Sequence, residues 1–490
     1  MKKNFFVLGV ALLSLFSFVS CAKVVMEDNY VVLASEAVAQ DAEWLKVAEA
    51  LQQKHSAEMI IYKESPCETM EALREIKPRY VAIVEKPENL GRDYVIDMHL
   101  ASREIDDDIY ADFVWGMITG YDAAAAMRMV DNSTEPLLIK DAVATITELN
   151  SAKWFDNYGW VDDHHKGLWG EKQGRHSEVK RDSVAPEQVL RKFSDLYVKY
   201  NPDLVVTAAH ATERNLEMPF SLGNFKPKDG GLYAEDRFTK ETWDIEQSGK
   251  RKVYFAVGNC LIGNVNNTKE SMAIAWMNDA NAATMIGYVV TTWHGRNGWG
   301  GLKYWITNPG RYTLSEAVYV NQQDFLHQQH QWFPSLIKER YPDFGRDEFR
   351  LARQRMQEVL GDRYSMEEIG FWHDRDVLAY YGDPKWDVRL QEVEGETDFE
   401  VTSEIKGKKC YITIKTKENF SLERMKGDNW KKEHVLDLPF SYFFPQRLCN
   451  PTLAEGQTWD VAVDENFLLV YNADFEPNST YEVVLDLNAE

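Results

Sequence analysis

The sequence predicts an α/β protein with two α/β units followed by a small β-sandwich. Short apolar runs alternate with segments of helical periodicity over residues 30–84, and the same alternation resumes over residues 186–292. Beyond residue 388 the helical periodicity is lost, and short alternating segments separated by turn residues take its place. Strands that alternate with helices indicate a mostly parallel sheet with covered faces, whereas successive short strands indicate a sandwich.

The first α/β unit begins with an apolar run over residues 30–34, continuous as in a strand that is buried on both faces. Residues 41–55 carry apolar side chains at helical spacing and predict the helix that follows. A second strand over 59–62, a helix over 68–76 and a third strand over 80–84 complete a β-α-β-α-β order. This order predicts a mostly parallel sheet in the first unit.

The second unit repeats the pattern with different spacings. An amphipathic helix is expected over residues 186–200, and strands over 204–208 and 253–257. A helix over 271–282 and a strand over 284–292 follow. The strands at 204–208 and 253–257 are consecutive strands of this unit, so we expect them to lie in one sheet.

Two segments interrupt this order, and the C-terminal segment replaces it. Residues 151–186 are rich in Trp, Gly and His and predict a loop, whereas the charged residues 334–374 predict helical structure. From these changes we expect a first α/β subdomain over 25–150, a catalytic α/β subdomain over 151–390 and an Ig-like β-sandwich over 391–490. The strands expected in the sandwich span residues 399–405, 409–415, 458–463, 467–471 and 481–487.

Composition limits the classes of partner. The chain has 490 residues, of which 44% are hydrophobic, so a globular protein with an ample core is expected. Its formal net charge of −23 would repel nucleic acid, and no polybasic patch is available for anionic lipid. We therefore expect no nucleic-acid partner.

The first 21 residues resemble a bacterial lipoprotein signal peptide. Lys2 and Lys3 precede an apolar run over residues 5–19, which is shorter than the ~20 residues that a membrane-spanning helix needs. The run leads to Cys21, although Phe18 stands where this signal usually has leucine. We expect Cys21 to become the lipidated N-terminus and to anchor the protein to a membrane of the bacterial cell envelope, facing the periplasm or the outside. An ordinary cleaved signal peptide is the alternative.

Cysteine usage is sparse for an exported protein. Beyond Cys21 the chain has Cys67, Cys260, Cys410 and Cys449, which is too few for a disulfide framework, and no Cys-x-x-Cys pair occurs. Cys67 opens a predicted helix and is expected to be a buried small hydrophobe. Cys410 and Cys449 share the C-terminal segment and either form a disulfide or remain free thiols. Cys260 needs a different explanation, because it follows a predicted strand.

His210 and Cys260 each follow one of two consecutive predicted strands. In a parallel sheet the carboxyl ends of neighbouring strands open onto one edge, where ligands bind, so the two side chains would meet there. An imidazole beside a thiol promotes the nucleophilic thiolate and can protonate a leaving amine. Gly258 suits a sharp turn before the cysteine, and the backbone N–H of Ala211 is a candidate donor to an oxyanion. Inert positions at the ends of strands are the alternative interpretation.

Four stretches resemble the gingipain-type cysteine peptidases, a family with the caspase–hemoglobinase fold. In that fold a histidine ends one strand and a cysteine ends the next, and here the separation is 260 − 210 = 50 residues. The resemblance runs in order over about residues 25–390. The stretches are Asp107-Asp108-Ile109-Tyr110-Ala111-Asp112 with Gly116 and Asp122, His210-Ala211-Thr212-Glu213, Cys260-Leu261-Ile262-Gly263-Asn264, and Tyr381-Gly382-Asp383-Pro384 with Val388-Arg389.

The resemblance implies a cysteine-type endopeptidase that acts on protein or peptide substrates without a cofactor. It assigns the nucleophile to Cys260 and the general base to His210, with Ala211 and Glu213 as oxyanion or orienting residues. It also implies that Trp293 and Trp299 belong to a loop that forms a wall of the substrate pocket.

Two departures from the family pattern lie beside these residues. Ala211 replaces the glycine that normally follows the base, and Asn264 replaces an aspartate. A catalytically inactive, peptidase-like surface lipoprotein that binds peptide or glycan is therefore the alternative function.

Three other groups of residues carry weaker hypotheses. Cys260, His294 and Asn297 follow the chain order of papain-like enzymes, but papain-like cysteines open a long helix rather than follow a strand. Residues 162–165, with two aspartates and two histidines, resemble a metal site but offer no third ligand by spacing, so a solvated loop is preferred. Residues 106–108 are three aspartates that could hold a structural calcium ion, although they lack an EF-hand pattern.

Overall fold

The computed structural model describes residues 24–147, 149, 151–342, 344, 348–393, 398–427 and 436–488. The predicted signal peptide and its lipidation site, Cys21, lie outside these residues, so both stay predictions. Within the described residues, no helix has the length and hydrophobicity that a membrane crossing requires.

A twelve-stranded sheet runs through both α/β units. Its strands are consistently buried in the middle of the sheet, and β1, β3, β10 and β16 are buried at every position, which explains their continuous apolar runs. The order across the sheet is β2 (Glu58–Tyr62), β1 (Tyr30–Ser35), β3 (Tyr80–Val84), β4 (Val114–Ile118), β18 (Leu378–Tyr381), β17 (Ala282–Tyr288), β16 (Lys252–Ala256), β10 (Leu204–Thr207), β6 (Asp141–Ala144), β7 (Asn157–Val161), β8 (Leu168–Gln173) and β9 (Lys180–Ser183).

The two halves of this sheet are each mostly parallel but run in opposite directions. Strands β2, β1, β3 and β4 are parallel to one another, as are β17, β16, β10, β6 and β7. Between the halves, β18 pairs parallel with β4 through Tyr381 and Met117, and antiparallel with β17. The predicted mostly parallel α/β architecture is confirmed, and β18 joins the two units into one sheet. The carboxyl ends of the second-half strands therefore share one rim of the sheet.

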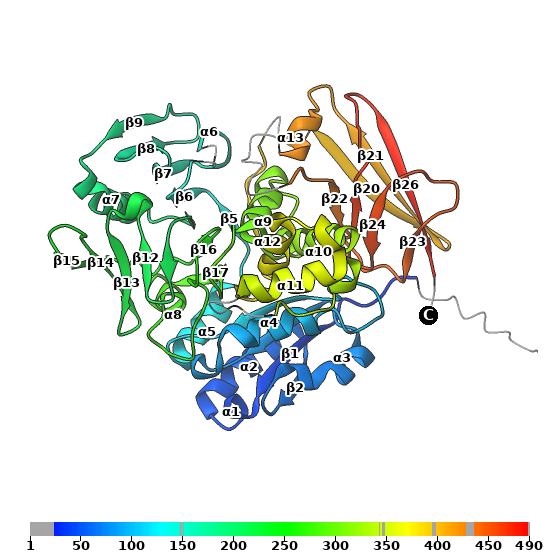
Figure 1. Ribbon diagram of the computed structural model, residues 1–490, viewed down its shortest axis with the longest axis horizontal. Coiled ribbons are helices and arrows are strands. Elements are labelled where there is room, and N and C mark those ends of the chain that lie inside the picture. Colours follow the sequence, from blue (N-terminus) through cyan, green and yellow to red (C-terminus); the bar gives the residue numbers. More distant parts are fainter. Residues whose placement is uncertain are drawn as a thin grey trace, which may run out of the picture.

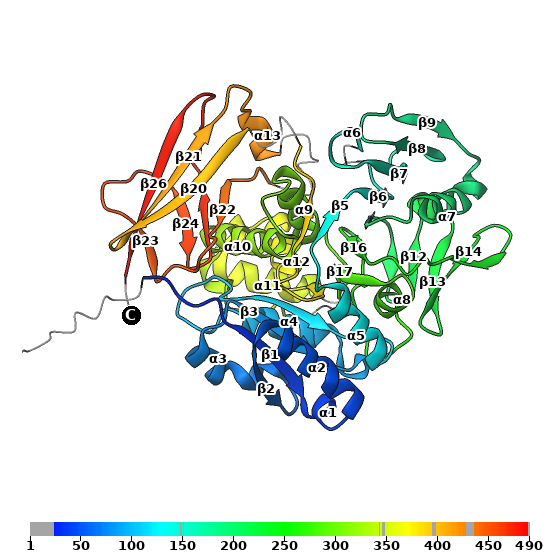
Figure 2. The ribbon, with the colours of Figure 1, turned by 180° about the vertical axis from the view of Figure 1, so that it is seen from behind.

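Helices cover the faces of the sheet (Figures 1 and 2). The α7 helix shows why: its buried residues Leu190, Phe193 and Tyr197 recur at helical spacing and face the core. The α8 helix is shorter than predicted, because Ser271 caps its start and Asn281 adopts a left-handed conformation (φ 56°) before β17 begins. The main helices of the described residues, including α7 and α8, are α2 (Ala42–His55), α3 (Met70–Ile76), α4 (Arg92–Ala101), α5 (Ala123–Asn132), α7 (Val189–Tyr200), α8 (Met272–Asn278), α9 (Arg296–Thr307), α10 (Leu314–Trp332), α11 (Glu348–Leu360) and α12 (Met366–Asp374).

The predicted loop over residues 151–186 was wrong, because three strands of the central sheet lie there. Strands β7, β8 and β9 form an antiparallel extension of the sheet. Gly159 and Gly170 serve close packing rather than turns: a Cβ atom on Gly159 would meet Tyr200 at 3.0 Å, and one on Gly170 would meet Trp160 at 2.1 Å. Glycines that normally indicate a loop are required here by neighbouring aromatic rings.

An antiparallel sheet that the sequence did not reveal is inserted between β10 and β16. Its first hairpin begins directly after His210 and returns toward the same rim. Its strands, in order, are β11 (Ala211–Thr212), β12 (Asn215–Glu217), β13 (Asn224–Lys228), β14 (Gly231–Glu235) and β15 (Thr242–Asp244).

A buried carboxylate, Asp383, organises the segment that follows β18. Its oxygens accept hydrogen bonds from Tyr30 (2.9 Å) and His55 (2.7 Å) and pair with Lys54 (2.9 Å). Asp383 follows Gly382, whose φ of 145° favours glycine and where a Cβ would lie 2.6 Å from Thr284. The Gly-Asp pair thus connects the end of β18 to β1 and α2 of the first unit.

The C-terminal β-sandwich is confirmed. Its two antiparallel sheets share one core, to which Phe399, Ile412 and Leu485 contribute from one sheet and Phe440 and Leu468 from the other. Figures 1 and 2 show α9, α10 and α12 between this sandwich and the second α/β unit. The sheets are β20 (Phe399–Lys406), β21 (Lys409–Thr416), β26 (Thr480–Leu487) and β23 (Pro451–Leu453), and β22 (Phe440–Phe443), β25 (Phe467–Val470) and β24 (Val461–Asp464).

The possible disulfide in this domain does not form. Cys410 and Cys449 are both free and buried, and the Cys449 thiol donates to the backbone carbonyl of Asn488 at 3.2 Å. Burial raises the pKa of the Cys410 thiol to about 11. The two cysteines therefore behave as small core residues.

Candidate active site

His210 and Cys260 leave two adjacent parallel strands at the same rim. Strands β10 and β16 pair in parallel with Thr207 opposite Ala256, and the ladder continues with a hydrogen bond from Val257 N to Thr207 O (3.0 Å). His210 follows the end of β10 after two residues, and Cys260 follows the end of β16 after three. The expected juxtaposition of the two loops is therefore present in the fold.

Asn259, which the sequence analysis did not single out, ties these two loops together. Its side chain is fully buried (0% exposed). The amide oxygen accepts from the Thr207 hydroxyl (2.8 Å), and the amide nitrogen donates to the carbonyl of Ala209 (2.9 Å). Both ends of the Asn259 amide are thus used to hold the segment before His210 against the segment before Cys260.

A second fixed point is the backbone turn that begins at Cys260. Leu261 has a φ of 57°, which is unfavourable for a bulky residue and is found where surrounding structure imposes it. Here its N–H donates to Val290 O, and Gly263 N donates to Tyr288 O, both at 2.9 Å. A Cβ on Gly263 would lie 2.2 Å from the carbonyl oxygen of Gly287. The chain therefore turns sharply at Cys260 and returns along the end of β17.

The two candidate side chains lie on loops at the same rim, and among the described residues no hydrogen bond joins them. The Cys260 thiol is partly exposed and lies 3.6 Å from the hydroxyl of Thr292. The His210 imidazole is exposed and makes no hydrogen bond or ion pair with Cys260 or with any other residue that the structure describes.

Ala211 presents its backbone N–H toward the outside of the inserted sheet. Glu217 N donates to His210 O (2.9 Å), so His210 and Glu217 form a hydrogen-bonded pair. Ala211 opposes Leu216 in the next position and is thus a non-hydrogen-bonded pair, in which both N–H groups point away from the partner strand. β11 is the edge strand of this sheet, and Ala211 is 7% exposed. Its role as an oxyanion donor stays a prediction.

Glu213 lies in the two-residue turn between β11 and β12. Its backbone carbonyl accepts from Met272 N at 2.8 Å, which attaches this hairpin to the start of α8. The side chain is half-buried, and within the described residues it makes no hydrogen bond with His210 or Cys260. Its orienting role stays a prediction.

The two tryptophans assigned to the substrate pocket lie in different environments. Trp299 is 6% exposed, and its Nε1 would lie 3.0 Å from a Cβ on Gly258, so the ring supports the turn before Cys260 from beneath. Trp293 is half-buried and packs edge-on against Phe349, with ring centroids 4.8 Å apart. A contact of either ring with substrate stays a prediction.

Asp374, at the end of α12, fixes the loop that carries Trp293. The carboxylate is buried and accepts from Trp293 N (3.0 Å), Arg296 N (3.1 Å) and His373 Nδ1 (3.0 Å). Burial raises the pKa of Asp374, but the hydrogen bonds and the neighbouring His373 outweigh burial and hold the pKa below its usual value. No local pattern indicated this role, because the donors lie in a segment distant in the sequence.

The papain-like alternative is not supported by the position of Asn297. Its amide is buried in the interface between α9 and α10, where the amide nitrogen donates to Gln322 (2.8 Å) and to the carbonyl of Arg375 (3.1 Å). The amide oxygen accepts from Asn321 at 2.7 Å. Asn297 therefore holds two helices together, and its side chain is only 1% exposed.

In the loop over residues 162–165 the two aspartates accept hydrogen bonds from nearby residues. Asp162 Oδ1 accepts from the backbone N–H groups of His164 and His165, both at 2.7 Å, and Asp163 accepts from Thr147 at 3.0 Å. Among the described residues these side chains do not form a group with metal-ligand spacing. The carboxylates are used to shape the turn.

Comparisons with known proteins show no match to a protein-family model. The sequence also matches no curated protein. A solved structure of the Arg-specific cysteine proteinase gingipain R is 9% identical with a TM-score of 0.42, covering 94% of this chain and 91% of that chain. A complex of the pro- and mature domains of RgpB from Porphyromonas gingivalis is 10% identical with a TM-score of 0.39, covering 94% and 93%. A structure described as a protease is 8% identical with a TM-score of 0.38, covering 94% and 91%. At these values the similarities carry no conclusion about function.

Proposed function

We propose that this protein is a cysteine-type endopeptidase in which Cys260 is the nucleophile and His210 the general base. The observation that carries the proposal is the pairing of β10 with β16, which brings a histidine and a cysteine to one rim of a parallel sheet. Asn259 then links the two loops, and the sharp turn at Leu261 leaves the thiol partly exposed. A purely structural cysteine needs neither a strained turn nor exposure.

In this mechanism the proton moves between two side chains and the substrate. The His210 imidazole takes the thiol proton, and the thiolate of Cys260 forms a bond to the carbonyl carbon of the scissile peptide. The C–N bond then breaks as the imidazolium gives its proton to the departing amine, which leaves a thioester. Water attacks the thioester, His210 accepts the proton of that water, and the acyl group leaves as a carboxylic acid while the thiol is restored.

The negative charge that develops on the carbonyl oxygen needs a donor at the rim. We infer that the Ala211 N–H supplies it, since this group faces away from β12 at the edge of its sheet. The methyl group of Ala211 does not remove the donor. It restricts how closely the substrate backbone can approach this N–H.

Cleavage of a diverse peptide library by the purified protein tests this proposal. The wild-type protein is expected to cleave some sequences, and Cys260→Ala is expected to lose all detectable cleavage because the nucleophilic sulfur is absent. Cys67→Ala is the matched control, since Cys67 is also a free, half-buried thiol but lies on the other half of the molecule. The proposal fails if the library binds but is not cleaved, which is the result expected of the alternative, an inactive peptide-binding protein. Cleavage that persists in Cys260→Ala would also contradict it.

A further inference from the structure

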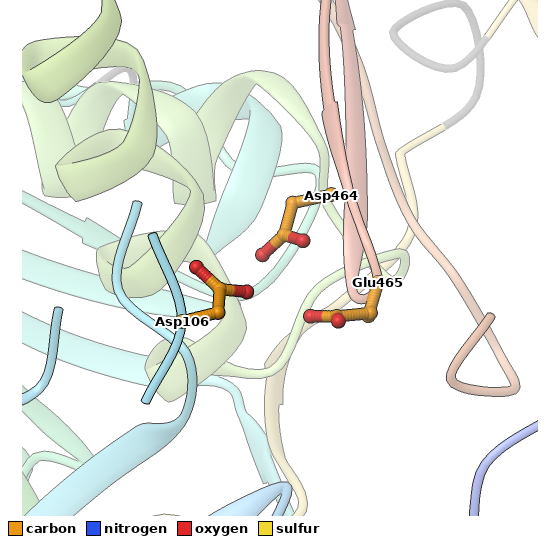
Figure 3. A group of neighbouring side chains, drawn as sticks. All are labelled: Asp106, Asp464 and Glu465. Atoms are coloured by element: carbon orange, nitrogen blue, oxygen red, sulfur yellow. The ribbon is translucent and has the colours of Figure 1, made fainter. Parts of the chain in front are cut away.

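Three carboxylates from two distant parts of the chain converge at the junction between the α/β body and the C-terminal sandwich. Asp106 lies in the segment between α4 and β4, Asp464 is the last residue of β24, and Glu465 follows it in the turn to β25. One oxygen from each lies within 4.8 Å of the other two. Figure 3 shows the carboxylates of Asp106 and Asp464 facing each other, with Glu465 directed toward the same space.

Two of these carboxylates are buried without the hydrogen-bond donors that buried carboxylates normally have. Asp464 is 7% exposed and Glu465 is 6% exposed. Asp464 Oδ2 and Glu465 Oε2 have no hydrogen-bond donor, and on the next residue the side-chain oxygen of Asn466 is also buried and unpaired. Buried polar groups are almost always paired, so three consecutive residues with orphaned oxygens indicate that a positive partner belongs there.

The described basic side chains supply a partner to Glu465 alone: its carboxylate forms an ion pair with Arg447. Arg447 Nη2 lies 3.6 Å from Glu465 Oε2, beyond hydrogen-bond distance, and Lys338 donates to the backbone carbonyl of Asp107. Within the described residues no Lys, Arg or His side chain forms an ion pair with Asp106 or Asp464. Burial and the nearby charges of Glu465 and Asp108 raise the pKa of Asp464 well above its usual range. Like charges in this arrangement repel one another until a cation neutralises them.

We propose that Asp106, Asp464 and Glu465 bind a calcium ion that fastens the C-terminal sandwich to the α/β body. All three ligands are carboxylates, which are hard oxygen donors, and the group contains no His or Cys that would favour zinc. Calcium accepts irregular oxygen geometry with mono- or bidentate carboxylates, whereas magnesium requires a near-ideal octahedron and keeps several waters. Asp106 was part of the aspartate run that suggested calcium, but its partners could not be found by spacing.

At this position a calcium ion would connect the C-terminal sandwich to the α/β body. Next to it, Asn466 Nδ2 donates to the carbonyl of Asp112 (3.4 Å), so the turn of the sandwich already contacts the body at this point. Farther along the interface, Tyr312 donates to Ser441 (2.8 Å) and Tyr471 to Asp324 (2.9 Å). A calcium ion would add a bond between the two parts where, without it, their carboxylates repel each other.

Calcium titration of the purified, EDTA-treated and dialysed protein tests the proposal. Calorimetry with CaCl₂ at pH 7.5 is expected to give a dissociation constant on the order of 10⁻⁴ M. Saturating calcium is expected to raise the Tm by several degrees, since only the folded chain assembles the three ligands. MgCl₂ at the same concentration is expected to bind at least tenfold more weakly.

Matched variants separate the proposed site from general effects of charge. Asp464→Asn and Asp106→Asn are expected to weaken calcium binding at least tenfold, whereas Asp107→Asn, an exposed neighbour outside the group, is expected to bind as the wild type does. The proposal is overturned if the wild type gives no binding heat and the same Tm in calcium and in EDTA, or if both Asp464→Asn and Asp106→Asn retain wild-type affinity. If Asp464→Asn does not fold, the calcium affinity of Asp106→Asn decides the test, because Asp106 is exposed.

Discussion

His210→Ala is expected to lower kcat/KM for peptide cleavage by about 10²- to 10⁴-fold. Without the imidazole, the Cys260 thiol loses the group that accepts its proton, and the departing amine loses its acid. KM should change little, because His210 is exposed and makes no contact that would shape the peptide-binding surface. Steady-state kinetics on the best library peptide, with thermal unfolding to check the fold, measures both effects.

His294→Ala is the control that distinguishes the proposed base from the papain-like alternative. His294 also follows a strand of the same half-sheet, but its backbone N–H is attached to Asp374 at 3.4 Å in the turn after β17. The expected change in kcat/KM is less than about threefold, well below the contribution of a general base. A large loss of kcat/KM in His294→Ala together with little loss in His210→Ala would identify His294 as the general base and contradict the assignment to His210.

Asn259→Ala should give an intermediate result in the same assay. It removes the hydrogen bonds to Thr207 and Ala209 but leaves both reactive side chains in place. A displacement of about 1 Å can cost about 10²-fold in rate, so kcat is expected to fall by about 10- to 100-fold with KM nearly unchanged. A variant with wild-type kcat would show that the link between the two loops has no role in positioning.

Asp383→Asn is expected to destabilise the fold by about 3 kcal/mol, because it removes one partner of a buried ion pair. Lys54 and His55 would keep their positions near the end of β18 without a charge to balance them. The free energy of unfolding from urea titration measures the effect. Asp387→Asn is the matched control: Asp387 lies in the same segment, but its side chain is 50% exposed and bonds to Arg389 at the surface, so a change below about 0.5 kcal/mol is expected.

Asp383 should also make the free energy of unfolding depend on pH. Burial raises the pKa of Asp383, but the hydrogen bond from His55 and the charges of Lys54 and His55 outweigh burial and lower the pKa from 3.8 to about 2. A carboxyl whose pKa is lower in the folded state stabilises the fold fully above its unfolded pKa. That contribution is about 2 kcal/mol and is lost as the pH falls from about 4 through about 2. The stability difference between wild type and Asp383→Asn should therefore shrink over this range, and a constant difference would contradict the assignment.

The buried strands and the larger part of the α/β order were predictable from sequence. Strands β1, β3, β10 and β16 are apolar at almost every position because both of their faces are covered. The segment over 151–186 was not predictable by the same method. Its glycines are fixed by rings that arrive from elsewhere in the fold, as Gly170 is by Trp160. A local pattern cannot distinguish such a glycine from one in a turn.

The candidate site was predictable to the level of two loops and no further. Strand order and side-chain chemistry identify His210 and Cys260, because parallel neighbours deliver their ends to one rim. Asn259 and Asp374 act through partners that only the folded chain brings within hydrogen-bond distance. The same limit applied to Asp106, whose proposed fellow ligands come from the C-terminal sandwich.

Covalent labelling of Cys260 tests the proposed catalytic pair most directly. A peptide acyloxymethyl ketone reacts with a thiolate that is activated by a neighbouring base, and intact-mass and peptide mass spectrometry locate the adduct. The expected result is one adduct per chain on Cys260 in the wild type, and at least 10²-fold slower labelling in His210→Ala. Labelling of Cys260 that is no faster than that of a free thiol in solution, or that is unchanged in His210→Ala, would contradict the account and favour a binding protein built on this fold.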